Sequence, residues 1–301
     1  MQTEPQLRTV RCADADGGHD TAYWQWGPNS APHVVVCVHG LTRTGRDFDA
    51  LAQALVARVG AGVRVICPDV VGRGQSDWLK NPEGYGFPQY VGDMLALLQQ
   101  LAQDGPMAQL DWVGTSMGGL IGMLVAGSPQ LPLPMPIRRL VLNDVGPTIE
   151  WSSLARIGSY LGKTGMFNSL DEATGYLKTI QAGFGQHTDA QWRALSTHMV
   201  RPLPEGGLTL HYDPDIALPF KRNTPEQAQA AEAAIWQVYE AITAQTLLIR
   251  GAQSDLLSPA TAQRMGEVGP KARLQVFENV GHAPTLLTPE QTTPVLNFLL
   301  E

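Results

Sequence analysis

Short runs rich in β-branched and aliphatic residues recur along most of this 301-residue chain, and longer amphipathic segments separate them. The runs occupy residues 33–38, 63–67, 110–114, 139–143, 246–250 and 273–277. Helical spacing marks the segments 48–59, 88–102 and 120–127. Because the runs are continuously apolar, they are typical of strands buried on both faces, as in a parallel sheet covered by helices. The alternation therefore predicts a doubly wound α/β sheet, preceded by a hairpin over residues 7–27.

A segment without strand-like runs interrupts this alternation between about Gly146 and Asn223. In and just after it, three hydroxyl residues are each followed three positions later by Glu or Gln, the capping-box pattern of a helix start. They are Ser169 with Glu172, Thr188 with Gln191 and Thr224 with Gln227. We therefore expect a sheet domain formed by residues 1–145 and 224–301, with a mostly helical cap over residues 146–223.

Charge and composition limit the partners. The formal net charge is −7 and no dense run of Lys or Arg occurs, so nucleic acid and anionic membranes are not expected as partners. The first ten residues lack the pattern of a secretory signal, and no apolar run reaches about eighteen residues. The three cysteines, Cys12, Cys37 and Cys67, are sparse and expected to be reduced. We expect a cytoplasmic protein that acts on a small molecule, alone or as a homodimer.

A Gly-x-Ser-x-Gly pattern lies where one predicted strand meets the following helix. Ser116 stands between Gly114 and Gly118, directly after the run 110–114 and before the helical segment 120–127. A sharp turn there would strain the serine backbone and expose its hydroxyl above the sheet edge, while the glycines let strand and helix approach. A dinucleotide-binding loop fits less well, because it would need glycine at position 116. The pattern predicts that Ser116 is a nucleophile.

A serine nucleophile needs an imidazole to take its proton and a carboxylate to orient that imidazole. His282 lies in a loop between the last predicted strand and the last helix, and it is the predicted base. Asp255 follows the strand 246–250 and is the predicted acid, since ligands of open α/β sheets collect beyond the carboxyl ends of strands. Asp144, which follows the preceding strand, is a rival for this role.

The oxyanion formed during acyl transfer needs hydrogen-bond donors. Gly40 lets the chain turn after the first parallel strand, so the amide of Leu41 is one predicted donor and that of Met117 is the other. His39 is expected to hold this loop by hydrogen bonds rather than to transfer protons. The remaining histidines show no metal-binding spacing, and no metal ion is expected.

Together these motifs resemble the α/β-hydrolase superfamily, in particular its cap-bearing, esterase-like members. The resemblance extends from about Val34 to the end of the chain and comprises HGLT at 39–42, DVVGRGQSD at 69–77, GTSMGG at 114–119, GAQSD at 251–255 and GHAP at 281–284. It implies a mostly parallel eight-stranded sheet flanked by helices, a cap inserted after the sixth strand, and cofactor-free acyl hydrolysis through an acyl-enzyme. It gives the segment 69–77 an architectural role.

Four residues are candidates for substrate contacts. Arg43 lies just beyond the oxyanion loop, where it could bind an acidic group. Trp151, Phe167 and Trp236 lie in or next to the cap and could line an apolar acyl pocket, although core packing explains such aromatic residues equally well.

The leading functional hypothesis is a carboxylic-ester hydrolase for small or medium esters. A lactonase or a carbon–carbon bond hydrolase would use the same three side chains, and the cap sequence does not decide between them. A ligand receptor on a hydrolase scaffold is the alternative of a different class, and turnover of a generic ester distinguishes it from an enzyme.

Overall fold

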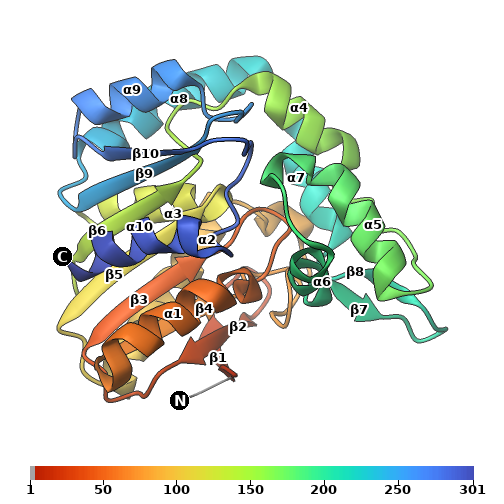
Figure 1. Ribbon diagram of the computed structural model, residues 1–301, viewed down its shortest axis with the longest axis horizontal. Helices are drawn as coiled ribbons and strands as arrows, with labels where there is room; N and C mark the ends of the chain where they lie inside the picture. Colours follow the sequence, from red (N-terminus) through yellow and green to blue (C-terminus); the bar gives the residue numbers. More distant parts are fainter. Residues whose placement is uncertain (1–3) are drawn as a thin grey trace.

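An eight-stranded sheet forms the centre of the protein, of which the computed structural model describes residues 4–301 (Figure 1). In sheet order its strands are β1 (Gln6–Cys12), β2 (His19–Trp26), β4 (Val63–Pro68), β3 (His33–Val38), β5 (Gln109–Thr115), β6 (Ile137–Asn143), β9 (Gln245–Gly251) and β10 (Arg273–Phe277). β1 pairs with β2 and β2 with β4 in antiparallel fashion, and the other neighbouring pairs are parallel. The predicted hairpin, strand runs and fold class are confirmed.

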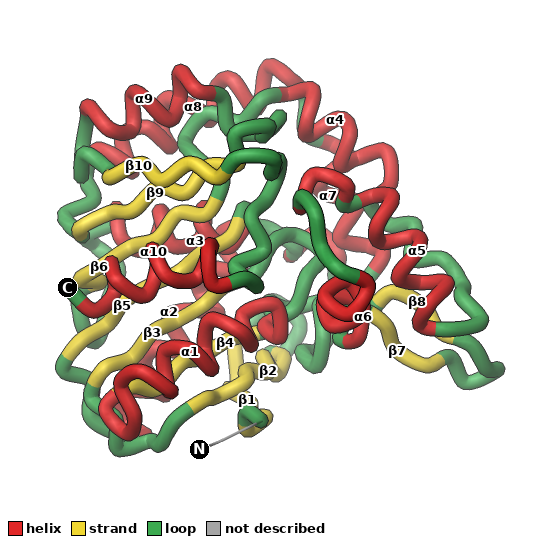
Figure 2. Tube along the Cα trace, in the orientation of Figure 1, coloured by secondary structure: helices red, strands yellow, loops and turns green. Residues whose placement is uncertain are grey.

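Helices cover both faces of the sheet, as Figures 1 and 2 show. They are α1 (Asp49–Val59) and α10 (Pro289–Leu300) on one face, and α2 (Phe87–Asp104), α3 (Met117–Gly127), α8 (Pro225–Glu240) and α9 (Pro259–Glu267) on the other. Alternation along β3 explains the two cores: Val34 and Val36 pack on the α2 and α3 side, whereas Val35 packs on the α1 side. Among the described residues, no helix combines the length and apolar character needed to cross a membrane.

A third layer lies at the carboxyl end of the sheet and comes from the chain between β6 and α8 (Figure 1). Its elements are α4 (Trp151–Tyr160), α5 (Leu170–Ile180), α6 (Asp189–Thr197), β7 (Val200–Pro202), β8 (Leu208–Leu210) and α7 (Ala217–Arg222). The three hydroxyl residues of the capping pattern are the N-caps of α5, α6 and α8, as predicted. This layer, called the cap below, occupies the segment that the sequence set apart.

The cap also contains a small antiparallel pair of strands, β7 and β8, which the sequence did not indicate. Each strand has three residues, too few to show an alternating pattern. The pair is extended by a bridge between Phe167 and Leu208, whose backbones exchange two hydrogen bonds of 2.8 Å. The expectation of a mostly helical insertion therefore holds, with this short hairpin as the exception.

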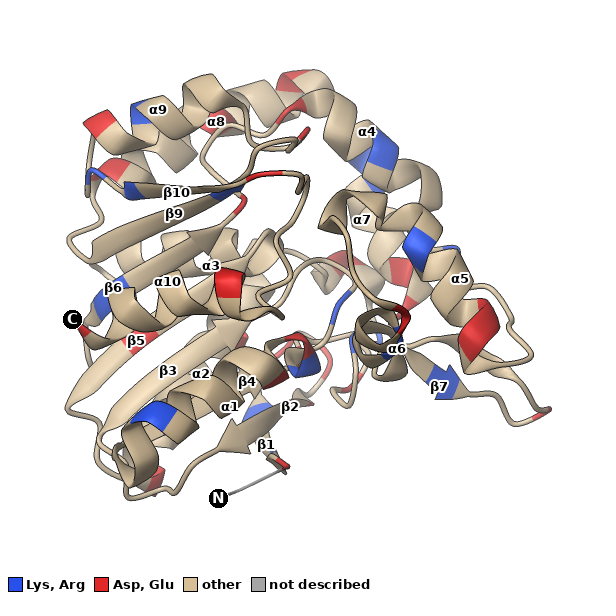
Figure 3. Cartoon of the chain, viewed as in Figure 1, with Lys and Arg blue, Asp and Glu red and all other residues tan. Residues whose placement is uncertain are grey.

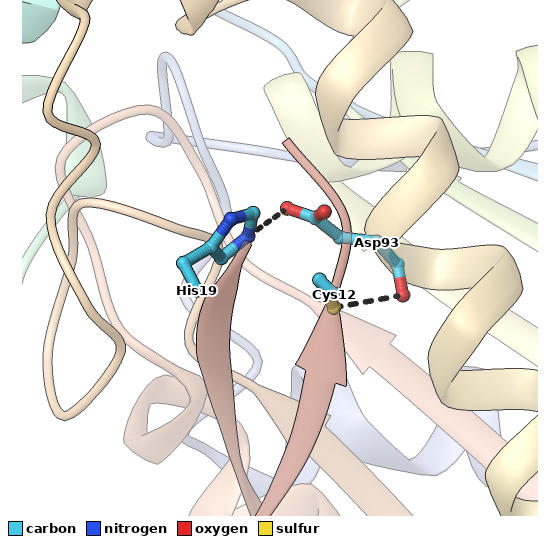
Figure 4. Close-up of side chains that lie close together, drawn as sticks. All are labelled: Cys12, His19 and Asp93. Carbon is cyan, nitrogen blue, oxygen red and sulfur yellow. Dashed lines mark hydrogen bonds and ion pairs between the residues drawn. The ribbon is translucent and has the colours of Figure 1, made fainter. Parts of the chain in front are cut away.

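A buried polar cluster attaches the N-terminal hairpin to α2 (Figure 4). The His19 imidazole lies between two carboxylates, with Nδ1 2.9 Å from Asp14 Oδ2 and Nε2 3.1 Å from Asp93 Oδ2. The Cys12 thiol donates to the backbone carbonyl of Asp93 over 3.9 Å. Although Cys, His and Asp are common metal ligands, both imidazole nitrogens are engaged by carboxylates, so the cluster is an ion pair rather than an open site.

Burial alone would lower the pKa of His19, but its contacts with Asp93, Cys12 and Asp14 outweigh that effect and raise the pKa to about 10. We therefore expect His19→Gln to lower the free energy of unfolding by about 3 kcal/mol near neutral pH, since Asp93 loses its buried partner. The stabilisation is complete below the unfolded pKa of about 6.5 and is lost as the pH rises towards 10. Urea unfolding across this pH range measures the effect.

His198→Gln is the control, because burial lowers the pKa of His198 and its charge does not change above about pH 7. The difference between wild type and His19→Gln should shrink with rising pH, whereas that for His198→Gln should stay constant. An undiminished difference at about pH 10 for His19→Gln would contradict the ion pair.

Candidate active site

The nucleophile candidate lies at the switch point of the sheet. β3 stands between β4 and β5, so the chain leaves β3 on one side and returns on the other, which opens a crevice at the carboxyl ends of β3 and β5. Ser116 follows β5 directly, as the N-cap of α3, with φ 51° and ψ −117°. A residue with a side chain rarely adopts such a positive φ, so the turn is strained and lifts the Ser116 hydroxyl out of the sheet edge.

The flanking glycines are required by close packing. A Cβ atom on Gly114 would overlap the carbonyl oxygen of Gly118, and one on Gly118 would overlap the carbonyl oxygen of Val38 at the end of β3. Gly114 and Gly118 therefore let β3, β5 and α3 converge beneath Ser116, as the sequence pattern predicted.

Three side chains form a hydrogen-bonded chain that begins at Ser116. The Ser116 Oγ atom lies 2.9 Å from His282 Nε2, and His282 Nδ1 lies 2.7 Å from Asp144 Oδ2. A carboxylate can only accept, so Nδ1 carries the proton and Nε2 is free to accept the serine proton. The Asp144 side chain is completely buried and that of His282 is 13% exposed. The geometry thus couples a hydroxyl, a base and a carboxylate from three separate loops.

The prediction that Asp255 orients His282 is wrong, and its rival Asp144 holds that position. Asp144 directly follows β6, has φ 57° and also accepts hydrogen bonds from Gly251 N at 2.9 Å and Ser254 Oγ at 2.7 Å. β6 and β9 are neighbours, so the last residue of β9 and the loop after it supply these donors. Asp144 is therefore fixed by donors from the very segment that was expected to supply the acid.

Asp255 faces the other way because its neighbour Ser254 occupies the inward position. The Ser254 hydroxyl contacts Asp144 and also accepts the amides of Leu256 and Leu257 at 3.3 and 3.1 Å. The Asp255 carboxylate is 48% exposed and forms a two-pronged ion pair with Arg156 of α4, at 2.8 and 3.0 Å. Partial burial alone would raise the pKa of Asp255, but the hydrogen bonds and the charge of Arg156 outweigh this effect, so the pKa is lowered.

The two predicted oxyanion donors adjoin Ser116. Leu41 lines the same cavity as Ser116, and Met117 is the first residue of α3, whose amide has no acceptor inside the helix. Within residues 4–301, neither the Leu41 nor the Met117 amide donates a hydrogen bond. Two unpaired amides beside the Ser116 hydroxyl suit the stabilisation of a developing negative charge.

Two buried residues hold the loop that carries Leu41. His39 Nδ1 contacts Gly40 O at 2.7 Å and His39 Nε2 accepts the Val70 amide at 2.9 Å, as expected from the sequence. Burial lowers the pKa of His39 to about 3, so the ring is neutral, as one donating and one accepting nitrogen require. Arg73 adds a hydrogen bond from Nε to Leu41 O at 2.8 Å, a contact that the sequence did not reveal.

A cavity of about 80 Å³ lies over Ser116, between the sheet domain and the cap. Besides Ser116 and His282, it is lined by Gly40, Leu41, Thr42, Arg43, Thr115, Arg156, Ile157, Tyr160, Ile180, Gln181, Phe184 and Ala283. The cap contributes an apolar surface from α4 and from the end of α5. A larger hollow of about 410 Å³ beside α8 contains neither a hydroxyl nucleophile nor a histidine, so its size does not make it a rival site.

Arg43 reaches this cavity, but its guanidinium is already engaged. It is 5% exposed and binds both oxygens of Asp47, at 2.7 and 2.6 Å. It also donates to Gln181 Oε1 and to the carbonyl of Leu195, both in the cap, and lies 5.5 Å from the centre of the Phe184 ring. Arg43 thus connects the sheet domain with the cap instead of offering a free charge to a ligand.

The three aromatic candidates for substrate contact are not among the residues lining the cavity in the described chain. Phe167 packs against Tyr176 at 5.5 Å beside the β7–β8 hairpin. Trp236 donates to Thr148 Oγ1 and lies beneath the Arg264 guanidinium, next to the larger hollow. Trp151 begins α4, ahead of the turn that faces the cavity. Phe167 and Trp236 thus pack within the cap or against α9, and substrate contacts by the three rings stay a prediction.

The chain is similar in sequence and in fold to known hydrolases. A family model described as "Alpha/beta hydrolase family" matches residues 35–294. The chain belongs to the alpha/beta hydrolase family. It is 47% identical to a 3-hydroxybutyrate-oligomer hydrolase of Cupriavidus necator over 97% of this chain and 96% of that protein.

More distant members of the hydrolase family show the same fold. A crystal structure of an alpha/beta hydrolase from Novosphingobium aromaticivorans superposes with a TM-score of 0.82 at 32% identity, covering 100% of this chain and 99% of that chain. A 2-hydroxy-6-oxo-2,4-heptadienoate hydrolase of Pseudomonas putida is 26% identical over 84% of this chain and 83% of its own length. Relatives of this chain are therefore named as hydrolases of chemically different substrates.

The geometry around His282 predicts which carboxylate matters for Ser116 reactivity. Asp144→Asn should slow labelling of Ser116 by a small fluorophosphonate by a factor on the order of 10⁴, because the imidazole loses its orientation. Asp255→Asn should slow labelling less than about tenfold, since Asp255 contacts Arg156 and not His282. Labelling rates of purified variants measure this, and a larger loss in Asp255→Asn would contradict the assignment.

Proposed function

We propose that the protein is a carboxylic-ester hydrolase that forms an acyl-enzyme on Ser116. The observation that supports this most strongly is the hydrogen-bonded chain from Ser116 through His282 to Asp144. A serine hydroxyl is a weak nucleophile on its own, and this arrangement supplies the base and the group that stabilises the resulting imidazolium.

The reaction runs in two halves. Ser116 Oγ attacks the ester carbonyl while His282 Nε2 takes the hydroxyl proton, and the Leu41 and Met117 amides stabilise the oxyanion. The intermediate collapses as the bond to the alcohol oxygen breaks, and His282 returns the proton to that oxygen. Water then attacks the acyl-enzyme, again giving a proton to His282, and the acid leaves as Ser116 recovers its hydrogen.

Similarity and cavity lining favour short aliphatic hydroxy-acid esters as substrates. The 47% identical relative is named as a hydrolase of 3-hydroxybutyrate oligomers, which are chains of small acyl units joined by esters. Leu41, Ile157 and Ile180 give the cavity an apolar side suited to a short acyl group.

The cap acts as a lid in this proposal. The residues of α4 and of the end of α5 that line the cavity lie directly over Ser116, so the cap limits access to the hydroxyl. Movement of the cap would admit substrate, and closure would then cover the acyl group. The polar contacts that join the closed cap to the sheet domain include those of Arg43 and the hydrogen bond of 2.7 Å from Gly281 N to Gly183 O.

Lactone opening and carbon–carbon bond cleavage remain alternatives with the same nucleophile. Similarity to the 2-hydroxy-6-oxo-2,4-heptadienoate hydrolase supports carbon–carbon bond cleavage as an alternative. A panel of aryl esters, lactones and vinylogous diketones ranks these substrates, and binding of an ester without turnover would indicate a receptor instead of an enzyme.

Ser116→Ala should lower ester turnover by a factor of about 10⁴ or more while the protein stays folded, because no other group can form the acyl-enzyme. Ser30→Ala, at an exposed position before β3, is the matched control and should retain wild-type rates. Turnover of an aryl butyrate and the circular dichroism spectrum measure the two properties. Appreciable turnover in folded Ser116→Ala protein would exclude the proposal.

Ile157→Ala should change kcat/KM unequally across esters of increasing acyl length, because Ile157 lines the cavity from α4. A lost methylene contact changes the selectivity by about 1 to 3 kcal/mol. Phe167→Ala removes a cap residue that packs against Tyr176 away from the cavity, so it should leave the chain-length profile unaltered. Equal changes in the profile for the two variants would show that the cap acts on substrate choice only through its stability.

A further inference from the structure

Two arginines line the cavity over Ser116, and they differ in exposure and in the number of hydrogen bonds that they make to the protein. Arg43 is buried, binds Asp47 through two nitrogens and donates to two cap acceptors. Its charge is neutralised and most of its donors are used. Arg156 has a 42% exposed side chain, and its ion pair is with Asp255, which is itself 48% exposed.

Arg156 is held at the cavity by its helix rather than by its ion pair. It lies on α4 with Ile157 and Tyr160, which line the same cavity. Two hydrogen bonds to backbone carbonyls attach the start of this helix to the loop after β9: Ser153 Oγ donates to the carbonyl of Asp255 at 2.5 Å, and Glu150 N to that of Leu256 at 3.3 Å. The position of Arg156 therefore does not depend on the Asp255 carboxylate.

A ligand can replace Asp255 in its ion pair with Arg156. Both side chains are solvent-accessible, and exposed pairs contribute little to stability. A carboxylate from a ligand offers the guanidinium the same two-pronged hydrogen bonding as Asp255 does. An incoming carboxylate can thus replace the Asp255 side chain, which then becomes hydrated.

From these observations we infer that Arg156 binds a free carboxylate of the substrate while the ester carbonyl lies at Ser116. The inference rests on the proposed ester hydrolysis and adds a substrate class: esters that carry an acid group, in which Asp255 occupies the carboxylate subsite when no substrate is bound. An oligomer of a hydroxy acid is such a compound, because it has a carboxylate at one end.

The charge of the protein makes a local cation important for such a substrate. The net charge is −7, which disfavours the approach of anions. In Figure 3, basic residues are scattered among acidic ones rather than gathered on one face, and the basic position of α4 is Arg156. Arg156 is the guanidinium of the cavity that is exposed enough to exchange its partner.

The test compares the free-acid dimer of 3-hydroxybutyrate with its methyl ester, which share the scissile bond and the acyl group. Arg156→Gln should lower the ratio of kcat/KM for the acid to that for the methyl ester by about tenfold, the value of one or two charge-assisted hydrogen bonds. Arg156→Lys keeps the charge without the two-pronged geometry and should give an intermediate ratio.

Arg222→Gln is the matched control, since Arg222 is also an exposed cap arginine paired with a sheet-domain carboxylate, that of Glu83. It should leave the ratio as in wild type. Equal losses on the acid and the methyl ester in Arg156→Gln would show that Arg156 merely holds the cap, and would overturn the inference.

Asp255→Asn gives an effect of opposite sign, because it removes the competing carboxylate. We expect the KM for the acid dimer to fall by up to about fivefold, the factor that corresponds to a weak exposed ion pair. A rise in this KM would show that Asp255 positions Arg156 instead of occupying the subsite, and would contradict the inference.

Failure of the inference is distinguishable from failure of the proposed function. Turnover of the methyl ester that is lost in Ser116→Ala, together with an unchanged ratio in Arg156→Gln, overturns the carboxylate subsite and leaves the ester hydrolase intact. Absence of turnover of either dimer and of aryl esters by the wild-type protein overturns both.

Discussion

The hydrogen bond between the buried carboxylate of Asp144 and His282 is the interaction on which the site depends. A buried charge is tolerated only when donors surround it, and Asp144 has a backbone amide, a hydroxyl and an imidazole within 2.9 Å. These donors come from the carboxyl end of β9, from the loop after it and from the loop after β10, so satisfying one carboxylate brings these segments together. The same interaction fixes the imidazole that faces Ser116.

Two arginines that differ in burial connect the cap with the sheet domain. Arg43 reaches from the sheet domain into the cap and is fully enclosed, whereas Arg156 reaches from the cap to an exposed carboxylate. The buried connection resists opening more than the exposed one, since breaking it leaves polar groups without partners. The Arg156–Asp255 pair can therefore exchange its contacts with solvent or substrate while the Arg43 contacts stay in place.

Sequence patterns were sufficient where local geometry determines the outcome. Gly114 and Gly118 permit only one kind of junction around Ser116, and continuous apolar runs identify buried strands. The choice between Asp144 and Asp255 depends on side-chain direction in two loops at neighbouring strand ends, which a linear pattern does not encode. The decisive feature is Ser254, whose hydroxyl turns inwards and leaves its neighbour outside.

The sequence determines the role of cap residues less closely than that of sheet residues, because aromatic side chains serve packing and binding equally well. Phe167 and Trp236 belong to the main hydrophobic core, while the less conspicuous Ile157 and Tyr160 line the cavity. Their spacing along α4 matches one helix face, but the sequence alone does not indicate whether that face meets the nucleophile or the rest of the cap.

The position of the cap within the chain has an evolutionary consequence. β6 and β9 are neighbouring parallel strands, and α8, which packs on α3, already provides the helix that connects such a pair. The cap therefore interrupts a strand–helix–strand unit that is complete without it. Because the entropy of closing a loop grows slowly with its length, this insertion can be lengthened, shortened or exchanged while the sheet keeps its register. Related proteins can therefore acquire new substrate specificities by changes in this one segment, while Ser116 and the sheet stay the same.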